Sequence, residues 1–159
     1  MAGPGDTVLA VLLAVSSPAL ASGAGVQAGG TTPLAVEARA AAAVVDAFHA
    51  ALRSGDTDAA LAMLADDVLI FEGGKVERSK PEYAAHHLAA DAAFSKAVSS
   101  VLTERTAGAS GNIAWVASEG RTRGEYRGRT IDRTSAETMI LRRAGDGWKI
   151  IHIHWSGSQ

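Results

Sequence analysis

The chain has 159 residues, of which 47% are hydrophobic and 20% charged, and its formal net charge is -2. That length is enough for one domain with a hydrophobic core and too short for two domains of usual size. The longest run of basic residues is the pair Arg142-Arg143, so we expect no nucleic-acid partner. The sequence contains no cysteine, which excludes disulfides and cysteine-based metal sites.

The amino-terminal segment differs in composition from the rest. Residues 7–20 are small and apolar, and Ala19-Leu20-Ala21 closes them with a small-x-small cleavage pattern. The run is shorter than the roughly 20 residues that span a bilayer. We interpret residues 1–21 as a signal peptide, 22–32 as a flexible linker and 33–159 as the domain of an exported protein, periplasmic or secreted, without membrane attachment after cleavage. Because Asp6 but no Lys or Arg precedes the run, a buried helix is the alternative.

Two helices are expected at the start of the domain. Thr32-Pro33 pairs a capping hydroxyl with a proline suited to a first turn, and the Ala-rich stretch that follows favours a helix to about Arg53. Its apolar residues recur every three or four positions, and Ser54-Gly55 ends it. A shorter helix then begins at Asp56 or Thr57.

A strand and a third helix follow. Val68 to Phe71 is rich in β-forming residues and ends at Glu72-Gly73-Gly74, which is typical of a turn. Ser79-Lys80-Pro81-Glu82 is a capping box, with serine at the cap and glutamate three residues later. It predicts a helix through about Phe94.

From Val98 to the end, every segment favours strand. The clearest strands are 113–123, 134–143 and 148–155, and Gly145-Asp146-Gly147 predicts a tight hairpin between the last two. Early helices followed by an antiparallel meander predict an α+β fold rather than alternating α/β. The sequence contains no phosphate-binding loop, dinucleotide fingerprint or nucleophile elbow, and we expect no cofactor.

Residues 36 to 157 resemble, in element order and in two strings, the nuclear transport factor 2-like (NTF2-like) superfamily. Phe48 to Gly74 is similar to the opening of ketosteroid isomerases, where a helix, a Gly-Asp turn and an Ala-Asp-Asp strand lead to the catalytic carboxylate. Ala136 to Gly157 resembles the association (hub) domain of calcium/calmodulin-dependent kinase II, including its His-x-His ending. Both strings also resemble SnoaL-like and DUF4440 proteins. The resemblance implies a cystatin-like cone, with amino-terminal helices on a curved, mixed or antiparallel sheet, a fold that hosts many functions.

The resemblance also implies catalytic positions. Glu72 falls where the isomerase has its general base, and an apolar cavity would raise the pKa of such a carboxyl toward neutrality. His87 shares a helix face with Tyr83 and is the expected polar partner of Glu72. Phe48 stands where the isomerase has an oxyanion-hole tyrosine, so we do not expect steroid isomerase activity. The alternative is that Glu72 only caps or pairs near the Gly-Gly turn.

The resemblance to both relatives puts Trp155 inside a pocket, and strand alternation adds Ile151 and Ile153 to the same face. The resemblance to the hub aligns one of its pocket arginines with Trp155 and the other two with Ala117 and Met139. We therefore expect the pocket to lack the hub's anion-binding charge. Such a pocket suits a small apolar or aromatic molecule. The expected lining is Phe48, Tyr83, Trp115, Ala117, Glu119, Glu137, Met139, Ile153 and Trp155. The alternative is that the large side chains among them fill the cone as core.

Two histidines, His152 and His154, lie near the carboxyl end of the chain. Alternation places His152 and His154 on the back of the sheet, which the resemblance implies is a dimer interface, so we expect a homodimer. Together with His86, His87 and Glu72 they supply enough donors for zinc or copper. We nevertheless expect no bound metal, because His152 and His154 would lie a sheet thickness from Glu72.

Three functions therefore remain open. The preferred one is an exported NTF2-like (SnoaL-like/DUF4440) domain that binds a small molecule in its cone. The second is an enzyme that uses Glu72 as general acid or base in a cofactor-independent isomerisation, hydration or elimination. The third is a non-catalytic dimerisation or assembly module.

Overall fold

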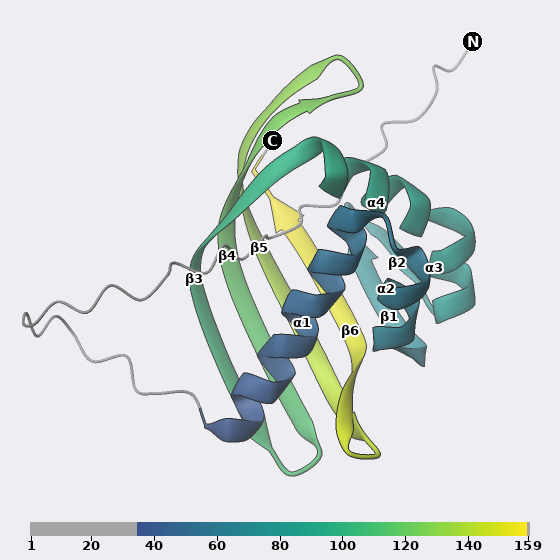
Figure 1. Ribbon diagram of the computed structural model, residues 1–159, viewed down its shortest axis with the longest axis vertical. Coiled ribbons are helices and arrows are strands. Elements are labelled where there is room, and N and C mark those ends of the chain that lie inside the picture. Colours follow the sequence, from purple (N-terminus) through teal and green to yellow (C-terminus); the bar gives the residue numbers. More distant parts are fainter. Residues whose placement is uncertain (1–34, 159) are drawn as a thin grey trace, which may run out of the picture.

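Two helices open the fold, and the structure, a computed structural model, describes residues 35–158 (Figure 1). The expected signal peptide and linker, and the expected helix start at Thr32-Pro33, lie outside the described residues. Helix α1 (Val36–Ser54) ends at Gly55, whose φ of 80° lets its N–H reach the carbonyls of Ala51 and Leu52. Helix α2 (Thr57–Met63) begins where the Asp56 side chain accepts a hydrogen bond from the Ala59 N–H at 2.9 Å. Within the described residues, no helix is long and apolar enough to cross a membrane.

A hairpin follows the second helix. Strand β1 (Leu64–Glu72) turns through Gly73 and Gly74, with φ of 53° and 80°, into the short strand β2 (Lys75–Glu77). Both turn positions need positive φ, which glycine adopts without steric cost. The sequence predicted the turn but not β2, because three residues are too few for a recognisable alternation.

The expected third helix is two helices. Helix α3 (Lys80–His86) starts at the predicted capping box, in which the Ser79 hydroxyl accepts from the Glu82 N–H at 3.2 Å and Glu82 accepts from the Arg78 N–H at 2.7 Å. Helix α4 (Leu88–Ala97) continues after a break at His87, which has φ of -113°. The break gives the two helices separate orientations against the sheet.

Four long strands complete the chain: β3 (Val98–Ser110), β4 (Ile113–Tyr126), β5 (Arg129–Ala144) and β6 (Gly147–Gly157). They form one six-stranded sheet in the order β2-β1-β6-β5-β4-β3, in which only β1 and β6 run parallel. The predicted α+β class is confirmed: helices precede a curved mixed sheet.

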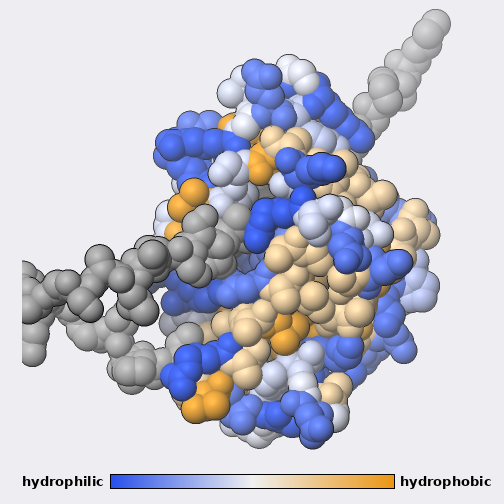
Figure 2. All heavy atoms as spheres, viewed as in Figure 1, coloured by the Kyte–Doolittle hydropathy of each residue, from blue (hydrophilic) through white to orange (hydrophobic). Residues whose placement is uncertain are grey.

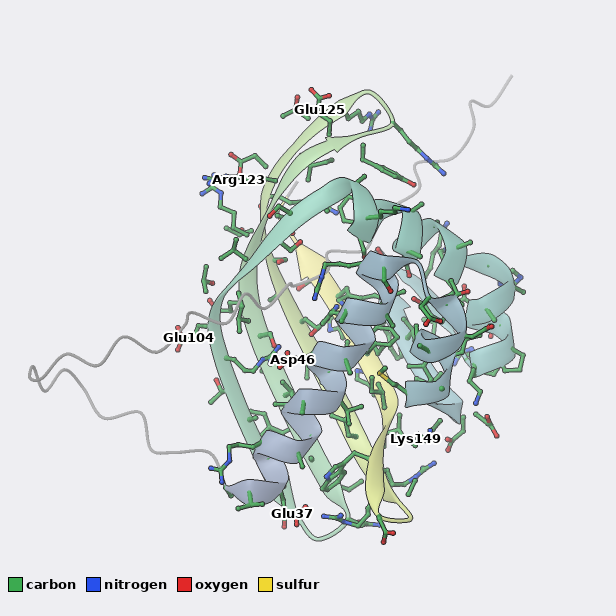
Figure 3. All side chains as sticks on the ribbon, viewed as in Figure 1. Glu37, Asp46, Glu104, Arg123, Glu125 and Lys149 are labelled. Atoms are coloured by element: carbon green, nitrogen blue, oxygen red, sulfur yellow. The ribbon has the colours of Figure 1, made fainter. Side chains whose placement is uncertain are left out.

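The helices cover one face of this sheet, and α1 crosses it diagonally (Figure 1, and with side chains Figure 3). Alternate residues of the strands point into the core beneath α1, for example Val116 of β4 beside Met139 of β5 and Ile153 of β6. On the outer side of the helices, Figure 2 shows an apolar area over α1 and α2 within a largely hydrophilic surface.

Strand β6 contains an irregularity that decides which residues reach the core. The register with β5 shifts between Ile140, opposite His152, and Leu141, opposite Ile150, so Ile151 is an extra residue on β6. Strict alternation would place Ile151 beside Ile153 on the inner face. Instead Ile150 and Ile153 are fully buried.

Candidate active site

Glu72 lies at the end of β1, beside Lys75 of β2 and Trp155 of β6. Burial, and next the charge of Asp91, raises the pKa of the Glu72 carboxyl to about 8, although Arg133 and Lys75 act in the opposite direction. Its Oε1 atom is buried without a hydrogen-bond partner among the described residues. A carboxyl with this pKa exists in both protonation states near neutral pH, so it can accept a proton and return it.

Tyr83 and Asp91 form a second titratable pair nearby. The Tyr83 hydroxyl on α3 donates a 2.8 Å hydrogen bond to Asp91 Oδ2 on α4, and both side chains are buried. Burial raises the pKa of Asp91 to about 7, and burial with the charge of Asp91 raises the pKa of Tyr83 well above its usual value. Tyr83 is therefore held as a protonated donor. Near-neutral carboxyl groups that gather in this way are typical of sites of proton transfer.

Glu72 and Tyr83 border a small pocket between the β1–β2 hairpin and α3. Its lining consists of Ile70, Glu72, Lys75, Glu77, Tyr83 and His87. The enclosed part measures only about 10 Å³, which is room for a single water molecule. The enclosed part of the pocket is thus too small for a ring system.

The structure brings three of the predicted site residues together here: Glu72, Tyr83 and His87 all line the pocket. The described contacts pair His87 with Glu77 rather than with Glu72, through a hydrogen bond from His87 Nδ1 to Glu77 Oε1. Glu77, one of the most buried acids of the chain, was missed because it follows the turn on the unrecognised strand β2.

Five other predicted pocket residues are packed as core beneath α1. They are fully or almost fully buried and comprise Phe48, Glu137, Met139, Ile153 and Trp155. Trp155 Nε1 donates to Glu137 Oε2 at 2.6 Å, and His49 Nε2 donates to Glu137 Oε1 at 3.1 Å. These contacts make Glu137 a buried acceptor for two rings, so this part of the cone is filled. His49 was not predicted, although a histidine next to Phe48 on a buried helix face needs a polar partner.

Three predicted pocket residues lie on the other side of the sheet. Trp115 is 42% exposed and Glu119 is also exposed, while the inner face of β4 carries Ala114, Val116 and Ser118. The assignment of Trp115, Ala117 and Glu119 to the pocket was therefore wrong. The three do share one face, as predicted, but a shift of one position in strand register moves a whole set of side chains to the opposite face.

His152 and His154 also lie on this outer face, away from Trp155. Both rings contact Phe71 of β1, with centroid distances of 5.3 Å and 6.5 Å. Burial, and next the charge of His154, lowers the pKa of His152. The predicted face is confirmed, whereas the role in dimerisation stays a prediction.

Comparison with known proteins agrees with this architecture. The family model described as a SnoaL-like domain matches residues 41–158. No curated protein sequence matches the chain significantly.

Several solved structures are similar to this chain. A candidate ketosteroid isomerase from Shewanella frigidimarina NCIMB 400 is 46% identical, with a TM-score of 0.71, over 74% of this chain and 94% of that one. A candidate calcium/calmodulin-dependent protein kinase II association domain from Xanthomonas campestris is 22% identical, with a TM-score of 0.65, over 81% and 93%. A candidate dehydratase of the NTF2-like family from Streptomyces avermitilis is 19% identical, with a TM-score of 0.63, over 77% and 97%. The last two likenesses concern the fold alone. With its helices on a curved sheet and a family match over most of its length, the chain belongs to the SnoaL-like family of NTF2-like proteins.

Proposed function

We propose that this protein is an isomerase-like enzyme that moves a proton on a small molecule, with Glu72 as the group that takes and returns the proton. The observation that carries the proposal is the Glu72 carboxyl itself: it is largely buried, lines a pocket, has a pKa of about 8 and keeps one oxygen without a partner among the described residues. The likeness to a candidate ketosteroid isomerase at 46% identity supports the same reaction class.

The pocket lining suggests how the reaction would proceed. An isomerisation that shifts a double bond removes a proton from one carbon and returns it to another, so a single carboxylate can perform both steps. Lys75 lines the same pocket and supplies positive charge toward an oxygen that becomes negative between the two steps. Ile70 and the ring of Tyr83 supply apolar contact. We therefore expect a substrate that carries a carbonyl group at its reacting end.

The experiment is to incubate the protein in deuterated buffer with a panel of small ketones and enones, and to follow proton exchange and double-bond shift by NMR. We expect catalysis by the wild type, and a loss of about 100-fold or more in Glu72→Gln, which is typical for removal of a general acid or base. Glu119→Gln is the matched control, because Glu119 is exposed on the far face of the sheet. Equal activity of Glu72→Gln and wild type would refute Glu72 as the base, and no exchange with any compound would refute the reaction class.

A second proposal concerns assembly, because the outer face of the sheet is partly apolar. Its exposed or half-exposed residues on β1, β6 and β4 include Leu69, Phe71, His152, His154 and Trp115. The net charge of -2 gives little repulsion between copies. We infer that this face meets the same face of a second copy, and the fold's likeness to a candidate association domain supports this inference.

Native mass spectrometry tests the dimer. The wild type should be a dimer, and Trp115→Glu with His154→Glu should shift it to monomer, because both changes place charge on the outer face. Lys96→Glu is the control, since Lys96 is an exposed charge on α4, away from that face. A wild-type monomer, or a dimer that the double variant leaves intact, contradicts the proposal.

A further inference from the structure

A cluster of imidazole and carboxylate groups surrounds the buried acid Glu77 at the rim of the pocket. Donor atoms of Glu77, Glu82 and His86 all lie within 4.8 Å of one another. His87 lies beside this group of three, with its Nδ1 hydrogen-bonded to Glu77 Oε1, while His86 Nδ1 lies 3.4 Å from Glu77 Oε2. One carboxylate therefore faces two imidazole nitrogens, one at each oxygen.

The break between α3 and α4 explains how two consecutive histidines reach the same acid. Neighbouring residues on a continuous α-helix point about 100° apart, which would separate the two rings. Here α3 ends at His86, and His87 lies at the break with φ of -113°. Both rings consequently turn their Nδ1 atoms toward β2.

Glu82 is held beside this group before any ligand binds. Its Oε2 accepts the Arg78 N–H at 2.7 Å as part of the capping box at the start of α3. Because that contact fixes the side chain, Glu82 can contribute an oxygen to a bound ion with little further ordering.

We propose that Glu77, Glu82, His86 and His87 bind a divalent transition-metal ion of the zinc type. Two imidazole nitrogens and two carboxylates form a donor set that zinc accepts in a four-coordinate site. Their charges match as well, since two carboxylates and two neutral imidazoles balance a doubly charged ion. Glu77 and His87 also line the pocket, so the ion has access from solvent and a ligand could reach it.

This site is separate from the proton transfer assigned to Glu72. None of its four residues is Glu72, and binding of the ion does not require Glu72 to act as an acid or a base. A Glu72→Gln variant should therefore bind the metal as the wild type does, so failure of one proposal leaves the other standing.

The competing zinc-binding feature is on the far side of the sheet. His152 and His154 stand two residues apart on β6, an arrangement that can chelate a metal on a strand. Their rings contact Phe71 and lie on the face opposite the pocket. Variants of the two histidine pairs therefore distinguish the sites.

The test is titration of chelator-treated full-length protein with Zn²⁺ by calorimetry and with Co²⁺ by visible absorption. The wild type should bind one ion per chain, and the Co²⁺ spectrum should report nitrogen and oxygen donors. His86→Ala should weaken binding by at least about tenfold, since loss of even an outer-shell partner typically costs 10- to 100-fold. The His86 ring is 59% exposed, so this change leaves the core intact.

His87→Ala and Glu77→Gln should weaken binding at least as much, with circular dichroism as the check on folding. The double variant His152→Ala with His154→Ala is the control and should bind like the wild type. The proposal is overturned if the wild type binds neither ion, if His86→Ala binds as tightly as the wild type, or if the control double variant alone loses binding.

Discussion

The indole Nε1 of Trp155 donates a 2.6 Å hydrogen bond to Glu137 Oε2, and both side chains are buried beneath α1. Glu137 accepts a second bond from His49 of α1, so one carboxylate connects that helix to β5 and β6. Trp155 is thus both a core residue and the donor that helps to satisfy a buried acid.

The first prediction concerns this acceptor. In Glu137→Gln an amide N–H₂ replaces one oxygen and faces a donor, so one buried hydrogen bond is lost and the free energy of unfolding should fall by about 1–3 kcal/mol. Urea denaturation measures the change. Glu119→Gln, on the exposed face, should stay within about 0.5 kcal/mol of the wild type. Equal effects of the two changes would show that the buried contacts of Glu137 contribute little.

The second prediction follows from the pKa of Glu72, which burial and Asp91 raise to about 8, while Lys75 and Arg133 lower it. In the unfolded chain the carboxyl has an ordinary pKa of about 4.5. Between these values the unfolded state releases the proton and the folded state keeps it. The free energy of unfolding therefore falls as pH rises from about 4.5 to about 8, by at most about 1.4 kcal/mol per pH unit.

Glu72→Gln removes this contribution, because the amide does not titrate. Thermal unfolding should show the variant more stable than the wild type at pH 8, with the difference disappearing at pH 4. If the pKa of Glu72 in the folded state were near its ordinary value, the melting temperatures of the two proteins would change with pH in parallel. That result would contradict the raised pKa of Glu72.

A third prediction concerns the Tyr83–Asp91 hydrogen bond. The Tyr83 hydroxyl lowers the pKa of Asp91, opposing the rise caused by burial. Tyr83→Phe should therefore raise the pKa of Asp91 further, and the lost bond should cost about 1–3 kcal/mol of stability. NMR titration of the Asp91 carboxyl carbon and urea denaturation measure the two effects. Tyr126→Phe is a matched control, because Tyr126 of β4 packs its ring against Phe94, whereas the hydroxyl bonded to Asp91 belongs to Tyr83. An unchanged Asp91 titration in Tyr83→Phe would contradict the prediction.

A fourth prediction tests the position of Trp115 on the outer face. The indole ring lies across Gly108 of β3, where an added Cβ would come within 2.7 Å of the ring nitrogen. Gly108→Ala should push the half-exposed ring outward and shift its fluorescence toward that of a solvated indole. The loss of stability should stay below about 1 kcal/mol, because the ring can move into solvent. Gly147→Ala, where a Cβ meets nothing within 4 Å, should leave the fluorescence unchanged, and an unshifted Gly108→Ala spectrum would contradict this placement.

Local chemistry explains which parts of the fold could be predicted. Gly55 and the Ser79–Glu82 box mark helix ends through their own backbone and side-chain contacts, so the sequence placed them correctly. The break at His87 was missed because no Pro or Gly marks it. Strand β2 was missed because its three residues pair only through the turn at Gly73-Gly74.

The candidate site, too, could be predicted only in part from the sequence. The position of Glu72 followed from the strand and turn around it, together with a family resemblance. The partners of the pocket could not be predicted, because Tyr83 meets Asp91 across the helix break and His87 meets Glu77 across the unexpected strand.

The sequence by itself determined the α+β class, the starts of α2 and α3, the final hairpin and the alternation that puts His152 and His154 opposite Trp155. These features depend on residues close together in the chain. Only the tertiary structure decided that Trp115 faces outward while Met139 faces inward, and that Ile150 rather than Ile151 enters the core. The physical reason is register: alternation tells which residues share a face, whereas the face that is buried depends on pairing with distant strands and on a single extra residue in β6.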